Sequence, residues 1–299
     1  MQEKFISKDS TLQIRGILML LIMFHHILNT VGYPKDTIAL NYIIRYSGYL
    51  STSIFFFLSG YGNWMSLSKT NDLDFKWLSK RILPLYSIFI PCFFISWIYY
   101  GHKARTLFRF AVFSLPDAIN WFPKIIMLCF VLLFITWKLP NKKSTMLLSL
   151  FGSISIYVIV CVILKVDAFW YNSVLCFPLG CLIAEYKEYI QSTSMIKTTI
   201  LFFVDLIMFV LVFALYGTKP TIQILLGLMI SIASAYVCTV VNIKSKLLRY
   251  FGKHSFELYL IHVSLMKILN YHIDSKIAYG ILLYICSISL LIVYTTIKK

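Results

Sequence analysis

The sequence predicts an all-α fold: a polytopic membrane helix bundle of about ten transmembrane helices, with both termini in the cytoplasm. Of its 299 residues, 59% are hydrophobic and only 13% are charged, whereas an ordinary soluble domain has about 25% charged residues. The apolar stretches run to about 20 residues, the length at which a helix crosses the bilayer. A β-barrel would instead show alternating segments of about ten residues. We therefore expect one integral-membrane domain over residues 1–299, with no soluble domain.

The apolar runs give the expected spans in chain order. A further apolar piece near residues 106–115 is too short and too basic to cross, so we expect it to be interfacial or re-entrant. The connections between the runs are short, so the chemistry of the protein must take place in or at the membrane. The expected spans are residues 14–33, 44–67, 81–101, 121–138, 145–164, 168–186, 197–216, 220–242, 254–272 and 277–297.

The lysines and arginines indicate the orientation of the bundle. With the N-terminus inside, most of them fall in cytoplasmic segments, as the positive-inside rule requires, and the segment 102–109 is the exception. The net charge of +16 is thus spread over short loops, so no nucleic-acid partner is expected. The seven cysteines stand singly in apolar segments without a CxxC pair, so neither a metal site nor a disulfide framework is expected.

The first expected span contains side chains that are costly in hydrocarbon: Arg15 near its start, and His25 and His26 further along. Arg15 and His26 are eleven residues apart, about three helical turns, so they share one face roughly 16 Å apart along the axis. His25 points about 100° away from that face. The layout places an anion-binding group near the cytoplasmic rim and a titratable base deeper in the membrane. A snorkelling arginine and a structural histidine are the alternative interpretations.

Arg15 and His26, with ten residues between them, are the first of several stretches that resemble the membrane acyltransferase family three. Its members are integral-membrane O-acyltransferases that modify bacterial surface glycans. Each stretch is a weak signal alone, but all of them occur in the order of the family's motifs. The other stretches are "FFFLSGYG" (55–62), "KRILPLY" (80–86), "NWFPKIIML" (120–128), "FPLGCLIAEY" (177–186) and "FGKHSFELYLIHVSLM" (251–266).

One position departs from the family pattern. The family has a second arginine three residues before the one that Arg81 matches, and here that residue is Leu78. Lys76 or Lys80 is the candidate to supply the charge, although an ammonium cannot make the bidentate phosphate contact of an arginine.

The resemblance implies transfer of an acyl group, usually acetyl, from cytoplasmic acyl-CoA to a hydroxyl of an extracytoplasmic or lipid-linked carbohydrate. Acyl-CoA is then the donor substrate, the lipid bilayer is the surrounding medium, and the bacterial cytoplasmic membrane is the expected location. The distribution of charge suits this chemistry, because a basic cytoplasmic rim would bind the phosphates of coenzyme A. The residues of this rim are Arg15, Lys76, Lys80 and Arg81.

The reaction needs a base, because an alcohol is a poor nucleophile at neutral pH and imidazole is the usual choice. We expect His26 to be this general base, with a covalent acyl-histidine as the less favoured variant. Ser59 and His262 are expected to complete the catalytic site, and the alternative for each is a structural hydrogen bond. Asp205 matches no motif and has no assigned role.

Two other classes of protein have a similar composition. A transporter or flippase of a glycan precursor would show charged residues along a central path and helices broken by glycine or proline. A glycan polymerase would normally have a sizeable outer loop, which this chain lacks. Within the acyltransferase interpretation, the bundle either acylates its acceptor directly or passes the group to a separate extracytoplasmic acyltransferase partner.

Overall fold

The computed structural model describes residues 5–32, 38–69, 74–99, 121–139, 142–217, 219–241 and 243–298. Every regular element in these ranges is a helix, which confirms the all-α prediction. The segments 102–109 and 106–115, for which the sequence predicts a basic loop and an interfacial piece, lie outside the described residues. The elements are α1 (Lys8–Val31), α2 (Ile38–Leu67), α3 (Phe75–Tyr99), α5 (Trp121–Trp137), α6 (Lys143–Ile163), η1 (Ala168–Trp170), α7 (Cys176–Glu185), α8 (Lys187–Ser192), α9 (Met195–Tyr216), α10 (Pro220–Val240), α11 (Lys246–Lys253), α12 (Ser255–His272) and α13 (Lys276–Ile297).

The chain is a multi-pass membrane protein. Within the described ranges, six helices are long and apolar enough to cross a membrane: α1, α3, α6, α9, α10 and α13. The helices α2 and α12 coincide with two further predicted spans but are less apolar, and α5 and α7 are shorter apolar helices. The expected number of ten spans therefore remains a prediction.

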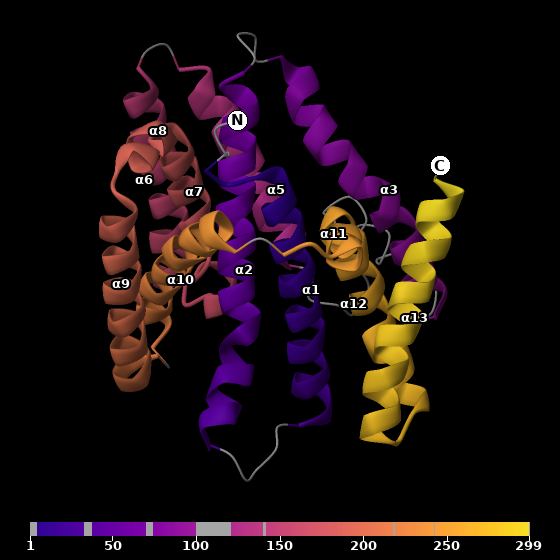
Figure 1. Cartoon of the computed structure of the whole chain (residues 1–299). Helices are drawn as coiled ribbons and strands as arrows, with labels where there is room; N and C mark the ends of the chain where they lie inside the picture. The colour runs from indigo at the N-terminus through magenta and orange to yellow at the C-terminus, as the bar shows by residue number, and fades with distance from the viewer. Residues whose placement is uncertain are drawn as a thin grey trace.

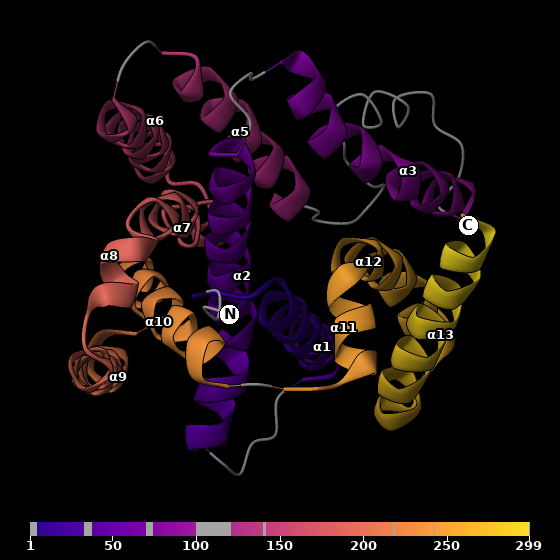
Figure 2. The same cartoon turned by 45° about the horizontal axis from the view of Figure 1, so that its top comes forward.

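The helices α1 and α2 occupy the middle of the bundle. They pack against each other, and α3, α5, α7, α10, α11 and α12 surround them (Figures 1 and 2). The outermost helix is α9, which has no buried residue along its 22 positions and packs on α10. A helix this apolar and this exposed is typical of a surface that faces lipid.

The helices α2 and α7 cross in close contact, and glycine makes this approach possible. A Cβ atom on Gly60 of α2 would overlap the carbonyl oxygen of Phe177, and one on Gly180 of α7 would overlap the carbonyl oxygen of Phe57. Small residues at such crossings allow helix backbones to pack closely in membranes. The glycine of each motif, "FFFLSGYG" and "FPLGCLIAEY", thus packs against the backbone of the other motif.

The prediction of one continuous span over residues 168–186 is wrong. The segment contains the single 3₁₀ turn η1, an irregular stretch, and then the ten-residue helix α7. Pro178 lies in the first turn of α7, where its missing N–H costs nothing, whereas in the interior of a longer helix it would break the hydrogen-bond ladder. The stretch that is left non-helical forms part of the site described below.

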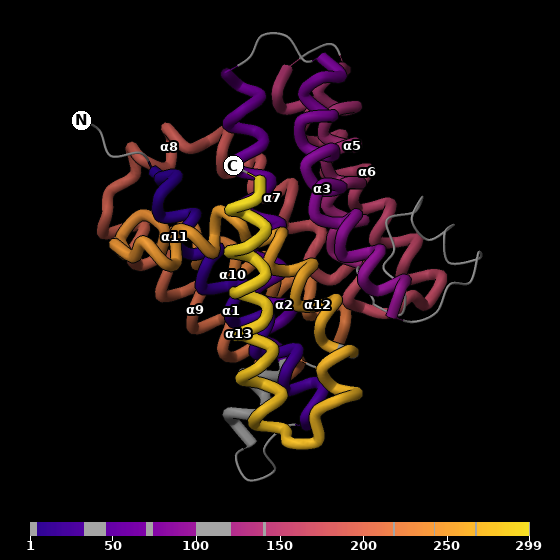
Figure 3. Tube along the Cα trace, turned by 90° about the vertical axis from the view of Figure 1, so that its right-hand side faces the viewer, coloured from indigo at the N-terminus to yellow at the C-terminus, as the bar shows by residue number. Residues whose placement is uncertain are grey.

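The start of α1 and the end of α13 lie at the same end of the bundle, and the end of α1 and the start of α13 lie at the opposite end (Figures 1 and 3). This arrangement agrees with two termini on one side of the membrane. The assignment of that side to the cytoplasm is a prediction from the distribution of lysine and arginine.

Candidate active site

A cavity of about 860 Å³ lies between α1, α2, α3, α5, the η1 turn, α10 and α12. Its wall follows α1 from Arg15 to Asn29, a rise of roughly 21 Å at 1.5 Å per residue. This length is a large part of the roughly 30 Å thickness of the hydrocarbon core. The two ends of the cavity differ in composition. Arg15 and Arg81 lie at the end near the start of α1.

His26 lies in the cavity wall between the two ends and is hydrogen-bonded to a second histidine. Its Nδ1 is 2.8 Å from Nε2 of His262, and Nδ1 of His262 is 3.0 Å from the carbonyl oxygen of Leu258. A carbonyl only accepts, so Nδ1 of His262 carries a hydrogen and its Nε2 accepts when the ring is neutral. Nδ1 of His26 then donates, and Nε2 of His26 keeps its lone pair. Two hydrogen bonds thus leave an unprotonated nitrogen on the side of His26 that faces away from His262.

His262 is fully buried and is absent from the cavity wall. Its place behind His26, bonded to the backbone carbonyl of Leu258, makes it a positioning residue and not a group that touches substrate. From the sequence, His262 was expected to be a catalytic residue, with a structural hydrogen bond as the alternative. The geometry combines the two, because the backbone bond of His262 fixes the tautomer of His26.

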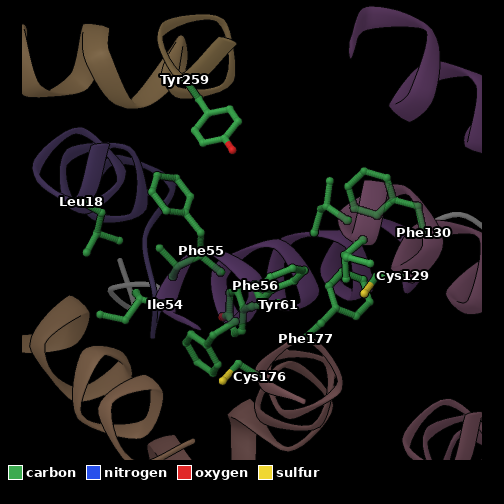
Figure 4. Packing of buried hydrophobic residues seen from close by; sticks show 14 of the residues in the cluster. Leu18, Ile54, Phe55, Phe56, Tyr61, Cys129, Phe130, Cys176, Phe177 and Tyr259 are labelled. Carbon is green, nitrogen blue, oxygen red and sulfur yellow. The ribbon is translucent and has the colours of Figure 1, made fainter. Parts of the chain in front are cut away.

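Ser59 and Tyr259 supply hydroxyl groups to different parts of the cavity wall. The ring of Tyr259 lies 5.5 Å from that of His262, beside His26. Ser59 is eleven residues, roughly 16 Å along α2, from Gly48, which packs against His25, so it lies toward Arg15. Among the described residues, neither hydroxyl has a hydrogen-bond partner, whereas the nearby Ser53 bonds back to the carbonyl of Tyr49. Figure 4 shows the Tyr259 ring reaching from α12 toward α2, with the hydroxyl at its leading edge. Both hydroxyls are therefore available to a ligand. Tyr61, close to Ser59 in sequence, is buried and absent from the wall.

Arg15 and Arg81 make one end of the cavity basic. Nε of Arg15 is buried and has no hydrogen-bond partner in the described part of the chain. Arg81 donates from Nε to Asn63 over 3.1 Å and from a terminal nitrogen to Ser66 over 2.8 Å, so α2 holds its guanidinium in place. A buried donor without a partner is costly, and an anionic ligand at this end would satisfy it.

Lys76 and Lys80 lie elsewhere. Both side chains are exposed and neither lines the cavity, while Leu78, at the position of the missing arginine, is buried. The arginines at positions 15 and 81 are thus the predicted basic residues that the structure brings together. A contact of either lysine with a donor remains a prediction, and it would concern a part of the donor outside the cavity.

The opposite end of the cavity is lined by polar side chains that the sequence did not single out as a group. They are Asn29, Tyr46, Tyr49, Asp167, Asn172 and Gln223, and His25 lies beside them. His25 accepts from the amide of Asn29 over 2.8 Å, so it lines the same cavity as His26 although it points to a different side of α1. The sequence feature that could have indicated this end of the cavity is the presence of polar residues inside or next to apolar runs, which is a sign of function in a membrane protein.

The arrangement defines a class of protein: a membrane-embedded helical enzyme that places an oriented imidazole between an anion-binding end and a hydroxyl- and amide-rich end. The sequence profile of the acyltransferase domain of acyltransferase family 3 matches residues 13–297. The chain therefore belongs to acyltransferase family 3, as its motifs predict, and it is an acyltransferase. Comparisons with curated proteins and with solved structures give no match.

Proposed function

We propose that the protein transfers an acyl group, usually acetyl, from cytoplasmic acyl-CoA to a hydroxyl of an extracytoplasmic or lipid-linked carbohydrate in the bacterial cytoplasmic membrane. The observation that carries the proposal is one cavity that joins Arg15 and Arg81 to the polar end past His26. An enzyme that takes its two substrates from opposite sides of a membrane needs such a connection. A transporter needs one too, but the family membership favours the acyltransferase.

The donor fits the basic end. Coenzyme A carries phosphates, and the guanidinium groups of Arg15 and Arg81 bind phosphate oxygens in a planar, charge-assisted geometry. The distance of roughly 16 Å between Arg15 and His26 along α1 leaves room for an extended pantetheine arm. The thioester carbon then lies beside the imidazole.

His26 acts as the general base. Its Nε2 takes the proton of the acceptor hydroxyl while the hydroxyl oxygen attacks the thioester carbon. The C–O bond forms, the C–S bond breaks, and the imidazolium returns the proton to the departing thiolate of coenzyme A. The hydroxyl of Tyr259 is placed to donate a hydrogen bond to the thioester oxygen as it gains negative charge. Ser59 lines the cavity nearer to Arg15, toward the donor's phosphates.

The test supplies radiolabelled acetyl-CoA to inverted membrane vesicles and follows the label into the lipid-linked glycan fraction. The wild type should label this fraction, His26→Ala should not, and Arg15→Ala should label it only weakly when acetyl-CoA is near the wild-type KM. His272→Ala is the control, because His272 is exposed at the end of α12 and bonds to Tyr99 outside the cavity. Labelling by His26→Ala at the wild-type rate would refute the mechanism. Absence of label from the wild type, with protein-dependent movement of glycan across the membrane, would support transport instead.

A further inference from the structure

The end of the cavity opposite the arginines contains a hydrogen-bonding wall that is fixed before any ligand arrives. Asn172 is almost fully buried and donates to Oε1 of Gln223 over 3.0 Å. Its own Oδ1 accepts from the hydroxyl of Ser173 over 3.1 Å, and Ser173 is completely buried. Buried polar networks in a membrane protein are costly unless every member is satisfied or a function uses them.

Tyr49 is the side chain of this wall whose hydrogen bonding is incomplete. Its hydroxyl is buried and has no hydrogen-bond partner within the described ranges, although its ring lines the cavity. Its backbone carbonyl, by contrast, accepts from the hydroxyl of Ser53 over 2.9 Å. A buried hydroxyl of this kind requires a partner, and because Tyr49 lines the cavity, we assign this role to a ligand bound there.

Asp167 brings a carboxylate to the mouth of the same end. The residue is exposed, lines the cavity, and has no ion-pair partner among the described residues. The turn that presents it is firmly held: Val166 bonds to the carbonyl of Cys161 over 2.9 Å, and Lys165 adopts a positive φ of 53°. Lys165 directly follows the C-cap of α6, and the bond from Val166 back to Cys161 is typical of a helix C-terminal cap, so the turn is part of the helix end.

We propose that this end of the cavity is the acceptor subsite, and that it takes an uncharged sugar residue whose hydroxyls bond to Tyr49, Asp167, Asn172 and Gln223; this inference rests on the function proposed above. Carboxylate and amide oxygens accept from sugar hydroxyls, and amide N–H groups and the tyrosine hydroxyl donate to them. Trp121 and Phe169, whose ring centroids are 6.0 Å apart, supply apolar faces for the ring of the sugar. The carboxylate of Asp167 disfavours an acidic sugar, because two carboxylates would then lie close together.

The probes are decyl glycosides with purified, nanodisc-embedded full-length protein and radiolabelled acetyl-CoA. The neutral panel is the β-glucoside, β-galactoside and β-N-acetylglucosaminide, and the acidic probe is the β-glucuronide. We expect the wild type to acetylate at least one neutral glycoside and to discriminate against the glucuronide. In Tyr49→Phe and Asp167→Asn, the acceptor KM should rise about tenfold, as for a lost hydrogen bond, with the acetyl-CoA KM unchanged. Asp167→Asn should also reduce the discrimination against the glucuronide.

Two matched variants control for structural effects. Tyr279→Phe removes another buried hydroxyl outside the cavity, and Asp274→Asn removes an exposed carboxylate from the α12–α13 connection, at the same end of the bundle. Both should keep the wild-type acceptor KM. An unchanged acceptor KM in Tyr49→Phe and Asp167→Asn would overturn the subsite. So would a preference for the glucuronide, or labelling of native membrane glycans with no neutral glycoside accepted. Failure to label any acceptor from acetyl-CoA, native glycans included, would instead refute the proposed function itself.

Discussion

The two ends of the cavity each contain a buried donor without a partner among the residues that the structure describes, but the surroundings of the two donors differ. At one end the donor is Nε of Arg15, and the second guanidinium, Arg81, is held by Asn63 and Ser66. At the other end the donor is the hydroxyl of Tyr49, and its surroundings are amides already bonded to one another. The first environment suits a charged phosphate and the second suits a neutral hydroxyl. The difference indicates that two chemically distinct groups meet in one cavity.

His26 lies between these ends, and this position explains why its orientation matters. A base that serves two substrates must present one unprotonated nitrogen to both. The bond to His262 and the bond of His262 to the Leu258 carbonyl provide this orientation without any charged partner. The comparison of the two ends therefore predicts different effects for substitutions at the centre, at the basic end and at the polar end.

The largest effect is expected from His26→Ala. Without the base, the acceptor hydroxyl keeps its proton, and the rate of transfer should fall about 10³-fold, within the range for general-base catalysis. Acyl transfer measured at saturating acetyl-CoA and acceptor checks this prediction, and His272→Ala is its control. A loss smaller than tenfold would place the base elsewhere.

Substitution at the basic end should act on the donor alone. Arg15→Ala should raise the acetyl-CoA KM about 30- to 160-fold, because a charge-assisted hydrogen bond contributes about 2–3 kcal/mol. Arg15→Lys should recover little, since lysine has no group equivalent to Nε. Steady-state kinetics with each substrate varied in turn separate the two KM values.

The exposed lysines provide the comparison for this end. Lys76→Ala and Lys80→Ala should change the acetyl-CoA KM by less than about threefold, as expected for solvent-exposed charges. An increase equal to that of Arg15→Ala would show that a lysine compensates for the arginine replaced by Leu78.

The removal of His262 should lower the turnover number without changing either KM. In His262→Phe, Nδ1 of His26 loses its acceptor, and we expect kcat to fall about tenfold while the protein loses about 1–3 kcal/mol of stability from the unsatisfied donor. His262→Gln keeps an acceptor at this position and should recover part of kcat. Equal kcat values in the two variants would argue against a role in fixing the tautomer.

A smaller effect than that of His262 is expected at the polar end from Gly48→Ala. A Cβ at this position would lie 2.5 Å from Cδ2 and 2.6 Å from Nε2 of His25, so the ring must move away from its bond to Asn29. The acceptor KM should rise a few-fold, on the order of 1 kcal/mol, as for overpacking of a tight site. Gly152→Ala is the control, because a Cβ there meets no atom within 4 Å. A change in the acetyl-CoA KM would contradict the separation of the two ends.

The sequence predicted most of the helices because apolar runs of about 20 residues have few other solutions in a membrane. It correctly placed α1 and its Arg15–His26 face, and the structure brings Arg15, His26, Ser59 and Arg81 to one cavity. It was wrong for residues 168–186, where apolar composition hid the break at η1 and the constraint of Pro178. Composition reports how a segment is solvated, whereas the position of a proline decides where a helix begins.

The acceptor end could not be predicted in the same way. Tyr49, Asp167, Asn172 and Gln223 belong to three separate parts of the chain, and no spacing rule relates them. The pairing of His26 with His262 joins residues 236 positions apart, so periodicity along one helix cannot reveal it. Such contacts depend on how the helices pack, and glycines at close helix crossings, such as Gly60 and Gly180, are the features of the sequence that indicate this packing.

The most direct test of the central claim is a comparison of sealed membrane vesicles of opposite orientation, both supplied with external radiolabelled acetyl-CoA and both containing an acceptor glycan. The cavity that joins the two ends predicts label in glycan only in inverted vesicles, where the cytoplasmic face meets the acetyl-CoA, and the labelled glycan should lie in the lumen. Permeabilised vesicles of either orientation should label equally. Labelling of sealed right-side-out vesicles at the same rate, or labelled glycan confined to the cytoplasmic face, would contradict transfer through the cavity.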